Sequence, residues 1–150
     1  MLNKIRTMAR EADVCVLATC RDGAAHCSLM AYVAGEDDRF YMVASAGSKK
    51  YQNLEANPRA SLLIDDRDRQ PKSGRGDISA LTVSAFRRDM SGDEEKVALA
   101  RLLERHPRIR ALASRPEARI VCLKASGYLL AQGVDKATYV DPAGEEAKKP

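Results

Sequence analysis

The sequence contains no tryptophan, and its five tyrosines and two phenylalanines make up only 5% of the 150 residues. Proteins that bind single-stranded nucleic acids stack the bases on aromatic side chains, so this scarcity argues against that class of protein. The 25 basic and 21 acidic residues leave a net charge of +4, which is too weak for a nucleic-acid footprint but permits an anionic small ligand. We therefore expect no nucleic-acid partner.

Long apolar runs are also missing. No window approaches the 18 or more apolar residues of a membrane helix, and residues 1–15 lack the continuous apolar stretch of a secretory signal. The cysteines (Cys15, Cys20, Cys27 and Cys122) form no C-x-x-C pair, so we expect no metal site. The first three fall in or beside expected strands, where a cysteine is usually a small buried thiol. The sequence predicts a cytoplasmic protein without disulfides or membrane contact.

The length suits a single domain spanning residues 1–150. Apolar periodicity and turn residues predict helices over 1–12, 48–56, 91–106 and 109–114, and strands over 14–19, 26–34, 40–45, 60–64 and 78–86. Residues 119–123 and 127–132 form either a further pair of strands or one bent strand. Residues 66–77 are expected to form a polar loop, and residues 143–150 a flexible tail. This order of elements predicts a mostly β protein, an antiparallel sheet or small barrel with peripheral helices.

Local signals mark several of these boundaries. Arg21-Asp22-Gly23 is typical of a hairpin turn. Ser91-Gly92-Asp93-Glu94 is typical of a capping box, in which the serine hydroxyl and the glutamate side chain satisfy each other's backbone amides. The helix that follows carries Val97, Ala100 and Leu103 on one apolar face.

The most informative stretch runs from Ala44 to Tyr51, where a strand is followed by Gly47 and then by a helix that begins Ser48-Lys49-Lys50. Serine is a favoured N-cap, but two lysines oppose the helix dipole, which favours anions at this end by about 0.3–1 kcal/mol per charge. A bound phosphate would resolve this conflict, because free amides, a hydroxyl and two ammonium groups would converge on it.

On spacing alone, a pair of solvated lysines at an exposed helix start remains the simpler interpretation. The GxxxxGK[ST] pattern of a P-loop is absent, so a nucleoside triphosphate site of that kind is excluded.

A resemblance over residues 16–64 favours the phosphate site over the pair of solvated lysines. In this span the chain resembles the pyridoxamine 5′-phosphate oxidase-like, FMN-binding split-barrel superfamily. The residues that carry the resemblance are Leu17-Ala18-Thr19, Gly23, Ala25-His26-Cys27-Ser28-Leu29-Met30, Tyr41-Met42-Val43-Ala44-Ser45, Ser48-Lys49-Lys50-Tyr51-Gln52-Asn53-Leu54 and Asn57-Pro58-Arg59-Ala60-Ser61-Leu62.

The resemblance implies an antiparallel, Greek-key-like split β-barrel that forms a homodimer and binds FMN at the subunit interface. It also implies a set of cofactor-binding residues. The phosphate would be held by Ser48, Lys49 and Lys50; the second strand would flank the flavin with His26, Ser28 and Leu29, and the third with Val43, Ala44 and Ser45. The flavin would then act on a small-molecule substrate or electron donor, in an oxidoreductase whose reaction the sequence does not specify.

Departures from the oxidase itself narrow the expectation. His26 stands where the oxidase has arginine, its C-terminal Arg-x-His segment has no counterpart, and its tryptophan beside the flavin is absent. Authentic pyridoxamine phosphate oxidation is therefore not expected. The alternatives are a non-enzymatic flavin or haem binding module and a deazaflavin-dependent reductase.

Some functional interpretations stay open at this stage. Residues 101–133, with Arg105-His106-Pro107 after a helix, resemble the haem-utilisation branch of the superfamily, so His106 is either a haem ligand or simply a helix-terminal residue. The loop at 66–77 is either an exposed hairpin loop or a lid, with Arg67, Arg69 or Lys72 meeting an anionic substrate. No nucleophile–base pair stands out, so no catalytic residue is assigned.

Overall fold

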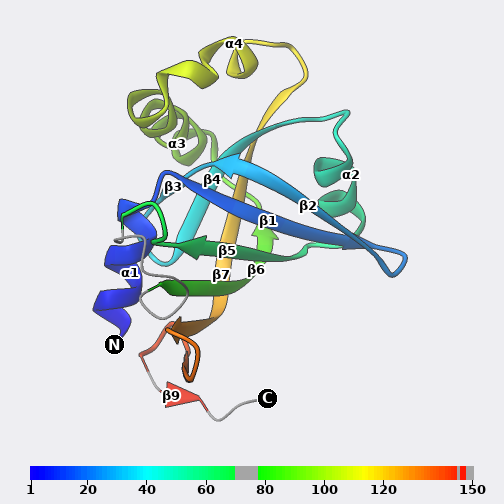
Figure 1. The fold of residues 1–150 in the computed structure, drawn as a ribbon. Helices are drawn as coiled ribbons and strands as arrows, with labels where there is room; N and C mark the ends of the chain where they lie inside the picture. Colours follow the sequence, from blue (N-terminus) through cyan, green and yellow to red (C-terminus); the bar gives the residue numbers. More distant parts are fainter. Residues whose placement is uncertain (70–77, 145, 148–150) are drawn as a thin grey trace.

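A curled antiparallel sheet with helices at its ends and edges makes up the chain (Figure 1). The computed structural model describes residues 1–69, 78–144 and 146–147. The strands are β1 (Val14–Arg21), β2 (Ala24–Ala31), β3 (Val33–Ala34), β4 (Arg39–Ser45), β5 (Arg59–Asp65), β6 (Ser79–Arg88), β7 (Ala118–Gln132), β8 (Lys136–Val140) and β9 (Glu146–Ala147). The helices are α1 (Leu2–Glu11), α2 (Lys49–Ala56), α3 (Gly92–Arg105), the 3₁₀ turn η2 (Pro107–Ile109) and α4 (Arg110–Ala113).

Strand order explains how the sheet curls. The strands follow the order β2-β1-β5-β6-β7-β4-β3, with β8 paired to β7 and β9 to β8, and every pairing is antiparallel. β7 is long enough to pair with β4 through its first half and with β8 through its second. A β-bulge opposite Ser84 and Ala85 bends β7 at Ser126, as bulges do when they add one residue to a strand. The 119–132 segment is therefore one bent strand.

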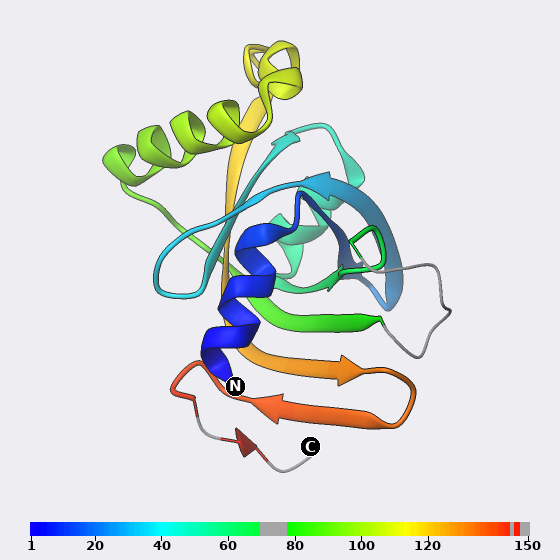
Figure 2. The same cartoon turned by 60° about the vertical axis from the view of Figure 1, so that its left-hand side comes forward.

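The architecture confirms the predicted fold class, a mostly β protein whose curled antiparallel sheet forms a half-barrel consistent with a split barrel. The inner face of the half-barrel carries the main core, where Leu17, Leu62, Leu81 and Leu130 are fully buried. Helix α1 closes one end of this core with Ile5, Met8 and Ala9 (Figure 2). The homodimer remains a prediction.

A second, smaller core lies between α3, α4 and the opposite face of β4 and β7. Here the structure corrects the expected face of α3, because Ala98 and Leu102 are buried whereas Val97 is exposed. The capping box is also only half formed. The Ser91 hydroxyl accepts a hydrogen bond from the Glu94 amide at 3.2 Å, but the Glu94 carboxylate pairs with Arg39 on β4.

The remaining elements follow their local signals, with three exceptions. Asp22 and Gly23 both have positive φ, as a two-residue hairpin turn of the primed kind requires. The predicted strand at 26–34 is divided into β2 and β3, and the short strands β8 and β9 were not predicted. Residues 70–77 of the predicted loop lie outside the described residues, so the lid stays a prediction, and so does the flexible tail at 143–150. None of the helices in the described parts of the chain is long and apolar enough to cross a membrane.

Candidate functional site

The start of α2 has the geometry of an anion site. The Ser48 hydroxyl donates to the Ser45 carbonyl at 2.7 Å and accepts from the Tyr51 amide at 3.4 Å, which confirms Ser48 as the N-cap. No acidic residue occupies the first turn. Within the described residues, the backbone amides of Lys49 and Lys50 donate to no protein acceptor. Two amides, two ammonium groups and the positive end of the dipole are therefore available to a ligand.

The side chains of Lys49 and Lys50 are not used by the fold. Lys49 is exposed and Lys50 half-buried, and neither forms an ion pair within the part of the chain that the structure describes. Two unpaired cations at a helix N-terminus are unfavourable by themselves, so the sequence carries a local cost here that an anion would remove. The residues present fit a phosphate monoester.

Helix α2 is held in place by polar contacts to β1. The buried side-chain amide of Asn53 donates to the Thr19 hydroxyl at 3.1 Å, and the side-chain amide of Asn57 donates to the Cys20 carbonyl at 3.1 Å. On the other side, Arg87 of β6 stacks on the Tyr51 ring with 4.8 Å between its guanidinium carbon and the ring centroid. These contacts fix the position of the Ser48 end relative to the sheet.

The three predicted residues of β2 fall on two faces. His26 and Ser28 are half-buried on the inner face, across from Thr19 and Leu17, and the Ser28 oxygen lies 3.3 Å from His26 Nε2. Leu29 points to the outer face and is 72% exposed. Its side chain therefore cannot share a pocket with those of His26 and Ser28 in one protomer.

The three predicted residues of β4 divide in the same way. Val43 is buried in the small core under α3, and Ala44 in the main core. The Val43 side chain therefore lies away from a ligand on the inner face, where only its backbone could make a contact. Ser45 is half-buried, and its hydroxyl accepts a hydrogen bond from the Gly47 amide at 3.4 Å.

The fold nevertheless brings the three predicted segments together. Helix α2 lies against both β2 and β4, and β2 approaches β4 where the two edges of the half-barrel face each other. His26, Ser28, Ser45 and the Ser48–Lys50 segment thus belong to elements that contact one another. Periodicity cannot foresee this convergence, because β2 and β4 stand far apart in the strand order.

The structure adds a neighbour that sequence reasoning missed. The Ala46 amide donates to the Glu117 carbonyl at 2.8 Å, and the β4–β7 register places Arg119 opposite Ala44. Directly opposite residues share a face of the sheet, so Arg119 lies on the same face as Ala44, just before the Ser48–Lys50 segment. No local signal marks this arginine, since its placement depends on pairing across 75 residues.

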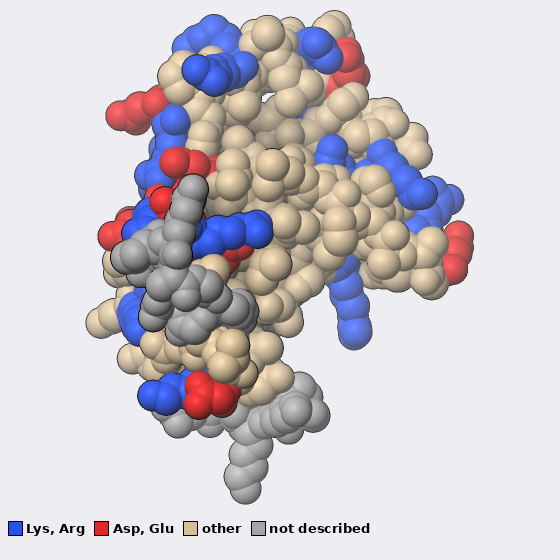
Figure 3. Space-filling view, viewed as in Figure 1, with Lys and Arg blue, Asp and Glu red and all other residues tan. Residues whose placement is uncertain are grey.

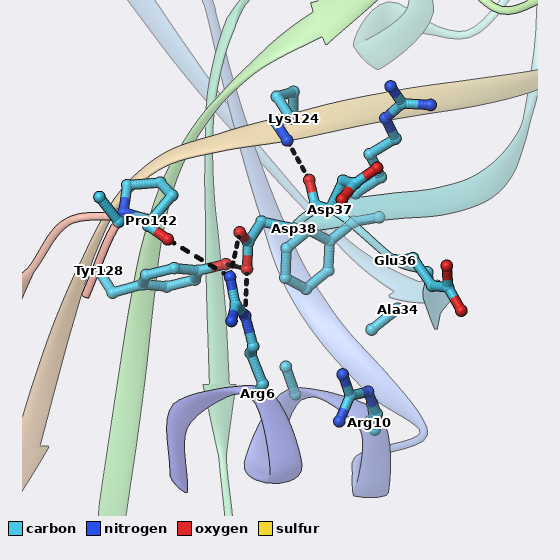
Figure 4. A pocket seen from close by; sticks show the side chains of 14 residues that line it. Arg6, Arg10, Ala34, Glu36, Asp37, Asp38, Lys124, Tyr128 and Pro142 are labelled. Carbon is cyan, nitrogen blue, oxygen red and sulfur yellow. Dashed lines mark hydrogen bonds and ion pairs between the residues drawn. The ribbon is translucent and has the colours of Figure 1, made fainter. Parts of the chain in front are cut away.

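A cavity of about 560 Å³ lies elsewhere, between α1, the turn at 34–38 and β7 (Figure 4). Its wall holds the buried Asp38 carboxylate, which accepts two hydrogen bonds from Arg6, at 2.8 and 2.7 Å, and one from the Tyr128 hydroxyl at 2.7 Å. None of the predicted site residues lines it. The acidic group there is already satisfied, so this cavity does not replace the start of α2 as the candidate site.

The remaining candidates have structural roles. His106 lies at the end of α3, and its Nε2 is 2.8 Å from the Tyr32 carbonyl oxygen, so this nitrogen already forms a hydrogen bond. Arg67 pairs with Asp65, and Arg69 pairs with Glu11.

The cysteines are all free thiols. Cys15 and Cys122 are buried, and burial raises the pKa of Cys122 to about 11, which disfavours the reactive thiolate. Cys27 is exposed on the outer face of β2, which corrects the expectation of a buried thiol there.

A curled antiparallel sheet that forms a half-barrel, with helices at its ends, places the chain among the split-barrel folds. The family model described as pyridoxamine 5′-phosphate oxidase matches residues 1–128, so the chain belongs to that family. This confirms the resemblance that the sequence suggested. No curated protein matches the sequence.

Solved structures share the fold at low sequence identity. A heme binding protein from Mycobacterium smegmatis is similar with a TM-score of 0.85 and 20% identity, over 95% of this chain and 58% of that protein. HutZ, a heme storage protein from Vibrio cholerae, has a TM-score of 0.65 and 18% identity, over 90% and 91% of the two chains. A FAD-binding protein from Mesorhizobium loti has a TM-score of 0.66 and 16% identity, over 84% and 90%. The chain thus spans little more than half of the first of these proteins.

Proposed function

We propose that the protein is an FMN-binding flavoprotein whose cofactor phosphate is held at the start of α2. The observation that carries the proposal is the Ser48–Lys50 segment, where a helix begins with two unpaired lysines, two free amides and no acidic residue. Membership of the pyridoxamine 5′-phosphate oxidase family supports this assignment. FMN would supply electron or hydride transfer, in an oxidoreductase acting on a small-molecule substrate or electron donor.

The chain's own residues have distinct tasks in this proposal. Ser48, Lys49 and Lys50 bind and neutralise the phosphate. His26 and Ser28 are the polar side chains of β2 on the inner face of the sheet, and they offer hydrogen bonds to the flavin. Ser28 Oγ donates to His26 Nε2 when that nitrogen is unprotonated, which leaves the proton on Nδ1. The backbone of Val43 and Ala44, together with Ser45, completes the wall.

The proposal includes a second copy of the chain packed on the outer face of the sheet. A row of aligned residues crosses this face from strand to strand, namely Leu29, Val16, Leu63, Thr82, Leu129 and Tyr139. Figure 3 shows that the surface over β1, β2 and β5 is largely free of charged side chains. Strand β2 is an edge strand, and no residue from Ala24 to Ala31 is charged. An uncharged edge beside an apolar face favours association, and a homodimer would cover both.

Haem is the second candidate ligand, since two of the similar structures are a heme binding and a heme storage protein. The chain has only two histidines, and the Nε2 of His106 is already bonded to a carbonyl. His26 is the axial ligand in that alternative, because it lies on β2, which contacts α2. The two ligands would then compete for one site.

Titration with FMN tests the proposed function. The unmodified protein should quench FMN fluorescence, and the Lys49→Gln/Lys50→Gln variant should bind FMN at least tenfold more weakly. The reason is that charge-assisted contacts to phosphate contribute about 1.5–3 kcal/mol each, and 1.4 kcal/mol is a factor of ten.

Lys96→Gln, an exposed lysine on α3, is the matched control and should bind FMN as the unmodified protein does. Equal affinity in the double variant would overturn the assignment. Failure to bind FMN, together with a haem Soret band that is lost in His26→Ala, would favour the haem alternative.

A further inference from the structure

The positive charge of the chain is concentrated in one short region. Residues 105–119 contain five arginines (Arg105, Arg108, Arg110, Arg115 and Arg119) and one acidic residue, Glu117. With His106 neutral, this segment has a formal charge of +4, which equals the net charge of the whole chain. The other 135 residues have a formal net charge of zero, so residues 105–119 account for the net charge of the molecule.

The fold turns these arginines toward solvent. The segment covers the end of α3, η2, α4 and the start of β7, an arm that stands off the main half-barrel in Figure 2. Ile109 and Leu112 face inward against the small core, and all five arginines are exposed. Arg105 pairs with Asp13, and Arg119 donates to the carbonyls of Pro116 and Ala118. Within the described residues, the side chains of Arg108, Arg110 and Arg115 form no ion pair or hydrogen bond.

One end of the arm lies beside the cofactor-binding segment. The Ala46 amide donates to the Glu117 carbonyl, Ser45 pairs with Ala118, and Arg119 lies opposite Ala44. Arg115 stands two residues before Glu117, and Ser48 two residues after Ala46. The backbone around Arg115 and Arg119 therefore lies next to the strand end that leads into α2.

We propose that Arg115 and Arg119 bind the phosphate or diphosphate group of a second, anionic ligand, a phosphorylated substrate or nucleotide electron donor that meets the cofactor at the α2 start. Guanidinium groups suit this task because they donate paired hydrogen bonds to phosphate oxygens and keep their charge at any physiological pH. A single-stranded nucleic acid fits less well, since residues 105–119 contain no aromatic side chain for base stacking. The inference rests on the proposed function for what lies next to the two arginines.

Inorganic pyrophosphate is the probe, titrated by calorimetry into the FMN-saturated protein at low ionic strength. FMN occupies the lysines at the start of α2, so pyrophosphate reports on the arginines. The Arg115→Gln/Arg119→Gln variant should bind pyrophosphate at least tenfold more weakly than the unmodified protein. Arg108→Gln/Arg110→Gln, which removes the same charge farther along the arm, is the matched control and should stay within twofold.

Fold integrity is tested separately, because Arg119 also bonds two backbone carbonyls. Arg115 has no such bond, so Arg115→Gln alone should keep the melting temperature and still weaken pyrophosphate binding by about threefold or more. Equal losses in the two double variants would mean a diffuse field and would overturn the inference. Absence of pyrophosphate binding to the unmodified protein would also overturn the inference.

Measurement of FMN affinity separates this inference from the proposed function. If Arg115→Gln/Arg119→Gln weakens FMN as much as it weakens pyrophosphate, the arginines belong to the cofactor site, and a second ligand site is excluded. If the unmodified protein binds no FMN, the proposed function fails. Pyrophosphate is then titrated into Lys49→Gln/Lys50→Gln, where loss on further removal of the two arginines would still support an anion site.

Discussion

At the scale of single residues, Asp38 is the clearest case of a buried charge put to structural use. Its side chain is only 5% exposed and accepts hydrogen bonds from Arg6 and Tyr128. The Arg6 hydrogen bond is the main cause that lowers the pKa of Asp38, and burial opposes it. The Arg6 partner in turn has a raised pKa, mainly through the same hydrogen bond. The pair ties α1 to the turn before β4.

Removing this carboxylate should destabilise the protein in a pH-dependent way. A lowered folded-state pKa means that Asp38 contributes stability above its unfolded pKa of about 3.9, and that this contribution is lost as the pH falls through the folded value. We expect Asp38→Asn to lower the free energy of unfolding by roughly 2–3 kcal/mol at pH 7. This is less than the 3–5 kcal/mol of fully buried pairs, because Arg6 is one-third exposed. Urea unfolding at several pH values measures the difference.

The control for this series is Asp22→Asn, whose side chain is 93% exposed and should leave stability unchanged. The difference between the unmodified protein and Asp38→Asn should shrink below about pH 4. A difference that stays constant down to pH 2 would contradict the assigned sign of the pKa shift.

At the scale of elements, α2 depends on one buried polar pair. The Asn53 amide and the Thr19 hydroxyl bond each other in the core at 3.1 Å, and each is 3% exposed. Removing one partner leaves the other buried without it, which costs about 1–3 kcal/mol, whereas replacing both by apolar groups of similar shape costs less. The pair therefore sets where α2 sits on β1.

A double-mutant cycle tests this dependence. Asn53→Leu and Thr19→Val should each lower the free energy of unfolding by about 1–3 kcal/mol, and the double variant should lose less than the sum. Chemical denaturation supplies the three values. Strict additivity would mean that the two side chains do not interact. Asn57→Ala, which removes a different bond from the same helix, should be additive with Thr19→Val if the coupling is specific to Asn53.

How far the sequence predicts these elements depends on the range of the interactions. Ser48 and Ser91 cap helices as predicted, and Asp22-Gly23 forms the predicted turn, because each signal acts within a few residues. The predicted buried face of α3 was wrong by one position, because Ala98 and Leu102, rather than Val97, pack against β4 and β7. The burial of Val43 under α3 and the approach of Arg119 to Ala44 depend on strand register. Register between distant strands has no local signature.

At the scale of the whole molecule, the exposed outer face predicts the oligomeric state. Leu29 is 72% exposed on an uncharged edge strand, and Leu63 and Phe86 are exposed on β5 and β6 of the same sheet. We expect a dimer by light scattering, and a monomer for Leu29→Glu, because the glutamate would place a charge in the apolar contact.

Val134→Glu is the matched control, since Val134 is 78% exposed but lies in the turn between β7 and β8. It should remain dimeric. A dimer that survives Leu29→Glu would place the contact elsewhere, and a monomeric unmodified protein would contradict the predicted dimer.

The Arg6 contact also bears on how the chain acquires its structure during synthesis. Besides Asp38, Arg6 donates to the carbonyl of Pro142 at 3.3 Å, and Leu2 lies beside Gly144. Helix α1 is thus translated before the segment around Pro142, which follows some 136 residues later. Contacts between such distant residues form late, because the intervening loop must close first. The packing of α1 on β3 and β5 therefore precedes its contacts to Pro142 and Gly144.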